Sequence, residues 1–223
     1  MSRIMVTGAG AGLGQAIGLA LENYGHEVLA FDRKHGNDVT QPRGEPPRSL
    51  DVLVNCAGVN KTGWLEDFSE AEWDEVMGVN AKGIYLMSQW ALPALIESRG
   101  TILNIVSNAS HMPMTTSLAY NASKGAAHIM TLQLARELTK RHGITVFGIS
   151  PNKLRGTEMS KDIEDQVVRH RGWTSEFAAE YQRNALLTGE ETPPSLVAEF
   201  VAFLLSSKDR HRFLSGCVIP YGA

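Results

Sequence analysis

A tyrosine and a lysine lie four residues apart in the stretch "AYNASKGA", residues 119–126. Residues at this spacing share one face of a helix, so Tyr120 and Lys124 can converge on one point. A phenol can serve as a general acid or base once its pKa moves towards neutrality, and a nearby ammonium group favours the phenolate. The same spacing also fits an ordinary exposed helix surface, so the pair indicates proton transfer only together with its neighbours.

Two further polar residues precede this pair. The apolar stretch "ILNIVSNAS" predicts a buried strand that ends at Ser107, which puts a hydroxyl at the carboxyl edge of a sheet, where open α/β folds bind ligands. The stretch "VMGVNAKG" places Asn80 within an apolar helix. A mid-helix asparagine commonly bonds only to nearby backbone, so Asn80 joins the group through its order in the sequence alone.

A glycine-rich turn near the start of the chain predicts a nucleotide site. In "TGAGAGLG", Gly8, Gly12 and Gly14 follow an apolar run and open a helical segment. Glycines permit a tight turn and let a pyrophosphate approach the free N–H groups of a helix. Close strand-to-helix packing is the alternative, and the position between strand and helix favours dinucleotide binding. Asp32 ends the second apolar run, where a carboxylate can bind ribose hydroxyls or serve as a plain turn residue.

The elements that must position these residues are short apolar runs bounded by turn residues, which predict buried parallel strands. These runs are "RIMVTG", "EVLAFD", "DVLVNCAG", "TILNIVS", "ITVFGIS" and "GCVIPYG". Segments of helical period lie between most of them, at residues 13–24, 73–97 and 117–142. The alternation predicts one α/β domain over residues 1–223, with a doubly wound parallel sheet covered by helices on both faces.

Residues 33–50 interrupt this alternation. Three prolines and several polar residues leave little room for a helix. We expect "NDVT", residues 37–40, to form a short third strand, and residues 41–50 to return as irregular chain to the next strand. The sheet should therefore be shortened around strand three.

A second segment, residues 152–190, predicts two short amphipathic helices. Apolar residues recur at helical spacing from Met159 to Val167, and an aromatic residue stands at every fourth position from Trp173 to Tyr181. We expect these helices to form a mobile substrate lid that excludes water. A rigid packed insertion is the alternative.

Composition limits the possible functions. The chain of 223 residues is 43% hydrophobic and 20% charged, which is typical of a globular protein with a sizeable core. A net charge of −3 without runs of like charge argues against a nucleic-acid partner. We expect a cytoplasmic protein with no membrane partner, because we find neither a signal segment nor an apolar run of membrane-spanning length. Cys56 and Cys217 lack metal-ligand spacing, so we expect buried free thiols and no metal.

In combination, these motifs resemble the short-chain dehydrogenase/reductase family nearly end to end. "TGAGAGLG" resembles the cofactor turn of the family, "NCAG" at 55–58 its strand-four signature, and "FLSGCVIPYGA" its closing strand. Asn80, Ser107, Tyr120 and Lys124 resemble its catalytic tetrad. "ISPNKLRGTEM" resembles the segment that carries a threonine near the nicotinamide, although Asn152 replaces the usual glycine and Thr157 comes one residue late. The resemblance implies a Rossmann-type fold.

The resemblance also implies hydride transfer between a nicotinamide cofactor and a secondary alcohol or carbonyl. Tyr120 would be the acid/base and Ser107 would hold the substrate oxygen. Lys124 would bind ribose hydroxyls and favour the phenolate, and Asn80 would anchor a water that conducts protons. The residues implied in cofactor binding are Gly8, Gly12, Leu13, Gly14, Asp32, Asp38, Val39, Asn55, Ala57, Gly58, Tyr120, Lys124, Pro151, Leu154 and Thr157. We expect NAD in preference to NADP, because the Asp32 carboxylate repels a 2′-phosphate.

The expected partner is a small alcohol or carbonyl compound in a pocket formed by residues 60–64, 108–114 and the segment after Pro151. Relatives suggest a homo-oligomer, either a tetramer or a dimer. Two alternatives to a dehydrogenase remain. One is a non-catalytic dinucleotide-binding module that senses redox state, and the other is a dehydratase or epimerase of the same fold.

Overall fold

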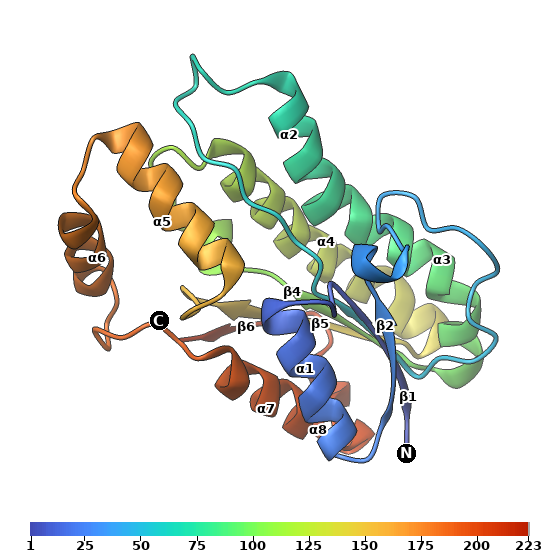
Figure 1. Cartoon of the computed structure of the whole chain (residues 1–223). Helices are drawn as coiled ribbons and strands as arrows, with labels where there is room; N and C mark the ends of the chain where they lie inside the picture. The colour runs from blue at the N-terminus through green and yellow to red at the C-terminus, as the bar shows by residue number, and fades with distance from the viewer. Residues whose placement is uncertain (223) are drawn as a thin grey trace.

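A computed structural model describes residues 1–222, which fold around a sheet of six parallel strands (Figure 1). The strands are β1 (Arg3–Thr7), β2 (Glu27–Phe31), β3 (Val52–Asn55), β4 (Thr101–Ile105), β5 (Thr145–Pro151) and β6 (Val218–Tyr221). Their order is β2-β1-β3-β4-β5-β6, and every neighbouring pair is parallel. The chain passes from β1 outward to β2 and then returns to β3 on the other side of β1. The carboxyl ends of β1 and β3 therefore flank a topological switch point, where such sheets bind ligands.

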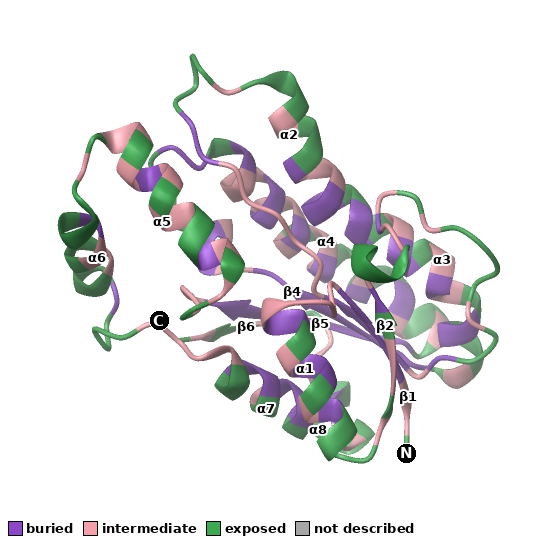
Figure 2. Cartoon of the chain, in the orientation of Figure 1, coloured by how far each residue is buried: buried purple, intermediate pink, exposed green. Residues whose placement is uncertain are grey.

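Helices cover both faces of the sheet, as the alternating pattern predicts. One face carries α1 (Gly12–Asn23), α7 (Pro194–Leu205) and α8 (Lys208–His211), and the other carries α2 (Glu70–Met77), α3 (Gly83–Ser98) and α4 (Leu118–His142) (Figure 1). Successive strand residues enter opposite cores: Ile4 packs with α1 and α7, and Met5 packs with α3 and α4. The central strands are therefore mostly apolar, and Figure 2 shows them buried, while the buried polar residues Asn55 and Asn104 bond each other.

The segment from residue 70 to residue 98 is continuous helix with one irregular turn. α2 begins with a capping box, in which Ser69 Oγ accepts from Glu72 N (3.3 Å) and Glu72 Oε2 accepts from Ser69 N (3.1 Å). A π-helical turn, Gly78–Lys82, separates α2 from α3. Such turns are frequent at functional sites, and this one contains Asn80.

The prediction of a third strand at residues 37–40 is wrong. The chain turns there, because Asp38 Oδ1 accepts hydrogen bonds from Thr40 N (2.8 Å) and from Thr40 Oγ1 (2.7 Å). A side chain that bonds the backbone two residues later in this way competes with the hydrogen bonds of a strand ladder. β2 is consequently an edge strand, preceding a short 3₁₀ turn, Arg33–His35. Residues 41–50 are irregular and contain no helix, as predicted.

The two helices predicted within residues 152–190 are present. They are α5 (Glu158–Arg171) and α6 (Ser175–Asn184), and each begins at a threonine cap. Thr157 Oγ1 accepts from Ser160 N (3.0 Å), and Thr174 Oγ1 accepts from Phe177 N (3.2 Å). Both helices lie beyond the ends of β5 and β6 (Figure 1), and α6 is largely exposed (Figure 2). None of the helices described within residues 1–222 meets the length and hydropathy needed to cross a membrane.

Candidate active site

The glycine turn packs directly against the loop that follows β3. Gly8 has a φ of +70°, and a Cβ there would lie 2.8 Å from the Ala57 Cα. A Cβ on Gly14 would lie 2.2 Å from the Gly8 carbonyl oxygen. Close packing thus accounts for these two glycines. Thr7, which sequence reasoning missed, joins the two segments further, because its hydroxyl accepts from Cys56 N (2.9 Å) and Ala57 N (3.0 Å).

The first turn of α1 is suited to an anion. Within the described chain its N-cap, Ala11, offers no capping side chain, and the turn carries no acidic residue. Free N–H groups and the helix dipole therefore face the glycine turn. Gly12 has a φ of +52°. A Cβ added to Gly12 would lie 3.7 Å from Cγ2 of Thr157, the residue that precedes α5. The residues present fit the pyrophosphate of a dinucleotide between α1 and the segment before α5.

Asp32 is joined to the same turn. Its Oδ2 accepts from Gly10 N (3.0 Å) and its Oδ1 accepts from Lys34 N (2.8 Å). A Cβ on Gly10 would lie 2.4 Å from the Asp32 carboxylate, so this glycine is needed for the contact. Lys34 reaches back as well, and its Nζ donates to the Gly10 carbonyl (3.0 Å). A carboxylate and an ammonium group therefore meet where the adenosine ribose would lie.

Three members of the expected tetrad surround the end of β4. Lys124 is 5% exposed, its Nζ donates to the Ile105 carbonyl (3.0 Å), and this nitrogen lies 5.8 Å from the centroid of the Tyr120 ring. Ser107 lies just beyond β4, its Oγ accepts from Ala109 N (3.2 Å), and its hydroxyl is close enough to Tyr120 to act on the pKa of the phenol. The structure therefore brings the serine, tyrosine and lysine together as the sequence pattern predicts.

Asn80 binds the loop that follows β3, next to Lys124. It is fully buried, and it bonds both backbone groups of Val59, accepting from N and donating to O at 2.8 Å each. Its Nδ2 also donates to Ser123 Oγ (3.0 Å). An added Cβ on Gly58 would lie 3.4 Å from Asn80 Oδ1 and 4.0 Å from Lys124 Nζ, so the loop passes between the two side chains.

Burial governs the electrostatics of this cluster. It raises the pKa of Tyr120 above its ordinary value, while the hydrogen bond from Ser107 acts in the opposite direction. The sequence predicted that positive charge near Tyr120 lowers the pKa of its phenol. In the chain without a cofactor, the loss of contact with water raises this pKa instead. Burial lowers the pKa of Lys124 to about 8. Burial also raises the pKa of Cys56 to about 12, so this thiol stays protonated and is no nucleophile at neutral pH.

The segments expected to line a substrate pocket meet beyond the tetrad. Asn121, next to Tyr120, donates to the carbonyls of Ala109 and Met112 and thereby holds residues 108–114 against α4. On the opposite side, Thr62 N donates to Gln166 Oε1 of α5 (2.8 Å). Trp64 Nε1 donates to the carbonyl of His170 (2.9 Å). Gly63 N donates to the Thr116 carbonyl (2.8 Å), so residues 60–64 contact both the loop before α4 and helix α5.

Other expected site residues have mixed environments. The side chains of Leu13 and Val39 are buried in the two cores, so only their backbone is free to contact a cofactor. Asn55 donates to Asn104 Oδ1 (2.9 Å), and its own Oδ1 is buried without a partner within the described residues. Cys217 is exposed beside the edge strand β6 and Cys56 is half-buried, so the expectation of two buried thiols is wrong for Cys217 and only partly met by Cys56.

Comparisons with known proteins agree with this arrangement. The family described as short chain dehydrogenase matches residues 37–168. The chain is 31% identical over 246 residues to 2-(S)-hydroxypropyl-CoM dehydrogenase 3 of Xanthobacter autotrophicus, covering 96% of this chain and 92% of that protein. It is 30% identical over 195 residues to 5-keto-D-gluconate 5-reductase of Escherichia coli, covering 74% and 76%. Among solved structures, one described as a "putative NAD(P) dependent gluconate 5-dehydrogenase" of Beutenbergia cavernae, with bound NADP at low occupancy, superposes with a TM-score of 0.85 at 25% identity, covering 98% of this chain and 94% of that chain.

Proposed function

Because this chain belongs to the short-chain dehydrogenase/reductase family, we propose that it transfers a hydride between NAD(H) and a secondary alcohol or carbonyl compound, with Tyr120 as the general acid/base. The observation that carries this proposal is the grouping of Tyr120, Ser107 and Lys124 beyond β4. A phenol, a hydroxyl that orients it and a buried ammonium group form a proton-transfer set. A redox-sensing module of the same fold would have no use for that set.

The residues at the switch point would hold the cofactor. The N-terminus of α1 and its glycines would bind the pyrophosphate, and Asp32 would accept hydrogen bonds from the adenosine ribose. Lys124 would bind the nicotinamide ribose, and Leu154 and Thr157 would face the carboxamide. When bound, the cofactor supplies the hydride acceptor or donor, which no side chain can provide.

The side chains of the chain itself would handle the proton. Ser107 would hold the substrate oxygen, and the Tyr120 hydroxyl would take up the proton of an alcohol or return it to a carbonyl oxygen. The raised pKa of Tyr120 in the chain alone requires a positive charge to bring it towards neutrality. Lys124 and the positive ring of the oxidised cofactor would both act in that direction. Asn80 would anchor a water between Lys124 and solvent.

We further propose that NAD is preferred over NADP, that the chain forms a dimer or tetramer, and that it works in the cytoplasm. Asp32 supports the cofactor preference, because its carboxylate lies at the glycine turn. Lys34, bonded to the same turn, favours a phosphate and moderates that preference. Family expectation alone supports the oligomeric state and the location.

A turnover assay tests the proposal. The purified chain is incubated with NAD or NADP and a panel of secondary alcohols, hydroxy acids and sugar acids, and the absorbance of reduced nicotinamide is followed. The panel includes compounds of the kinds named by the relatives, such as gluconate. We expect turnover of at least one compound with NAD. Tight binding of NAD without turnover of any compound would favour the redox-sensing alternative.

A further inference from the structure

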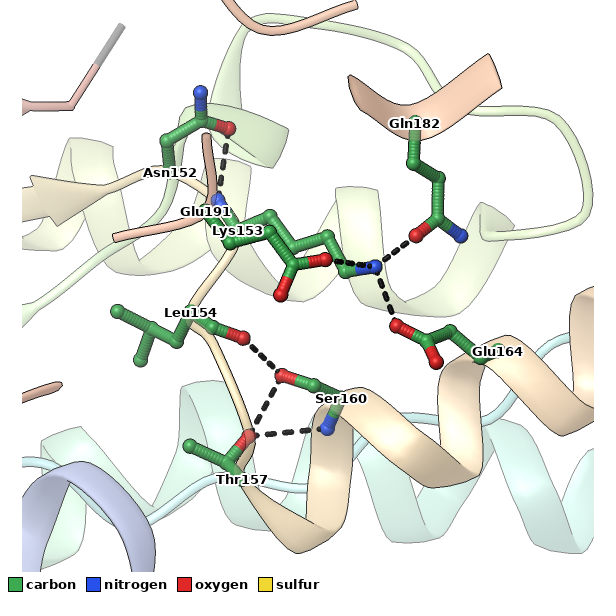
Figure 3. Close-up of polar contacts among 8 residues, drawn as sticks. All are labelled: Asn152, Lys153, Leu154, Thr157, Ser160, Glu164, Gln182 and Glu191. Atoms are coloured by element: carbon green, nitrogen blue, oxygen red, sulfur yellow. Dashed lines mark hydrogen bonds and ion pairs between the residues drawn. The ribbon is translucent and has the colours of Figure 1, made fainter. Parts of the chain in front are cut away.

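One lysine outside the catalytic set joins the helices that cover the candidate site. Lys153 follows β5, and its Nζ donates to Glu164 Oε1 (2.7 Å), to Glu191 Oε1 (2.7 Å) and to Gln182 Oε1 (Figure 3). Glu164 belongs to α5, Gln182 to α6, and Glu191 to the segment after α6. The lysine side chain is 19% exposed. A single, largely buried ammonium group therefore connects three segments of the chain.

The backbone of the same residue belongs to the loop expected beside the nicotinamide. The Lys153 carbonyl accepts from Thr192 N (2.9 Å), and Arg155 N donates to Thr192 O (2.9 Å). On the other side of this loop, Ser160 of α5 donates to the Leu154 carbonyl (Figure 3). Residues 152–157 are thus fixed to the segment after α6 by backbone and to the first turn of α5 by side chains.

α6 has a small buried face. Ala178 is its only buried residue within the described chain, and Phe177 and Tyr181 are about half exposed, at 50% and 52%. Both rings pack on Trp173, in the turn after α5, with centroids 5.0 Å and 4.9 Å away, so apolar contacts join α6 to the end of α5. Hydrogen bonds with an ionised partner are stronger than neutral ones. The bond from the Lys153 ammonium to Gln182 is a direct polar attachment of α6 to the loop after β5, and the two ion pairs of Lys153 fix the segments on either side of α6.

We propose that Lys153 is a positioning residue, which holds α5 and α6 closed over the nicotinamide end of the site and keeps residues 152–157 in place. The expected effect on kinetics rests on the proposed function, whereas the inference that Lys153 holds α5 and α6 in place does not. α5 transmits the constraint to the substrate side, because Gln166 and His170 of this helix accept hydrogen bonds from Thr62 and Trp64. Loss of the ammonium group would leave Glu164 and Glu191 to repel each other.

Kinetics of the Lys153→Met holoenzyme test this proposal, since methionine keeps the apolar stem and removes the charge. A ligand that binds only the closed state has its apparent affinity reduced by the fraction of closed molecules, so we expect KM for the substrate to rise about tenfold while kcat changes by less than about threefold. The Kd for NAD should rise less than KM, by at most about threefold, because Asp32 and the glycine turn lie outside the cluster and only the contacts of residues 154–157 with the nicotinamide end are loosened. Lys153→Arg should recover most of the loss.

The control is Lys161→Met, which removes an exposed lysine from α5, one of the helices that Lys153 contacts. It should leave KM, kcat and hydrogen exchange at wild-type values. A Lys153→Met enzyme with wild-type KM would overturn the proposal. So would a rise in KM that arginine does not recover, or an equal loss of NAD affinity, which would indicate a general structural role.

Hydrogen exchange separates this proposal from the proposed function. In the NAD complex of Lys153→Met, the amides of α5 and α6 should exchange faster than in the wild type, while those of the sheet are unchanged. This measurement needs no turnover, so it stands even if the panel of substrates yields no activity. Unchanged exchange in α5 and α6 would refute the closure by Lys153.

Discussion

Replacement of Asp32 by serine should change the choice between NAD and NADP. The carboxylate accepts from Gly10 N at 3.0 Å, and in the proposed function it would bind the adenosine ribose near its 2′ position. Asp32→Ser keeps an oxygen that can accept from Gly10 N and removes the negative charge. Lys34, bonded to the Gly10 carbonyl at 3.0 Å, would then face a 2′-phosphate without opposition.

The size of the effect follows from two opposing charges at this turn. Unit charges about 4 Å apart interact by about 4 kcal/mol at an effective dielectric constant of roughly 20. Repulsion of a 2′-phosphate by Asp32 is offset in large part by attraction to Lys34, because both groups bond the same residue. We expect a remainder of about 1.4 kcal/mol, which is a tenfold preference of the wild type for NAD.

The assay is the ratio of kcat/KM for NAD to that for NADP with one substrate. Asp32→Ser should lower this ratio at least about tenfold, and Lys34→Met should raise it by a similar factor. A wild type that prefers NADP would refute the reasoning. A ratio that stays within about twofold of the wild type in Asp32→Ser would refute it as well.

Three further predictions concern other parts of the site. Gly10→Ala should weaken NAD binding, measured by titration, because its Cβ would lie 2.4 Å from the Asp32 carboxylate; Gly18→Ala, with its nearest neighbour at 3.7 Å, should bind normally. Burial lowers the Lys124 pKa from 10.5 to about 8, so the unfolded chain binds more protons within that window and the contribution of this lysine to stability rises as pH increases through it. Lys124→Met removes the buried charge, so at pH 7 its unfolding free energy should exceed that of the wild type. This difference should shrink by about 2 kcal/mol between pH 7 and pH 10, and a difference that stays constant in denaturant titrations would contradict the prediction. Residues 158–184 should gain hydrogen-exchange protection when cofactor and substrate bind, and equal protection with and without them would indicate a rigid insertion rather than a lid.

Strands and helices were predictable where burial dictates the sequence. All six apolar runs are strands, because the central strands of a parallel sheet are buried on both faces and therefore mostly apolar. The two helices after β5 were predictable from their spacing of apolar and aromatic residues. The strand expected at 37–40 failed, because that pattern contains a single buried apolar side chain, Val39, and an aspartate that bonds Thr40 locally.

The candidate site was predictable only in part. Ser107, Tyr120 and Lys124 were selected through the resemblance to the family, because the spacing of Tyr120 and Lys124 alone also fits an exposed helix surface, and one strand end and one helix carry all three. The contact of Lys34 with Gly10 depends on a turn that local propensity does not specify. The cluster around Lys153 assembles residues from three separate segments, and only the packing of α5 and α6 reveals it.

The kcat of Tyr120→Phe, measured together with its Kd for NAD, tests the proposed role of Tyr120 most directly. Phenylalanine keeps the ring beside Lys124 and removes only the hydroxyl near Ser107. If Tyr120 is the general acid/base, kcat should fall by about 100-fold or more while the Kd for NAD stays within about twofold of the wild type. A variant that keeps about a tenth of the wild-type kcat, a loss smaller than general acid–base catalysis typically supplies, would contradict the proposed role.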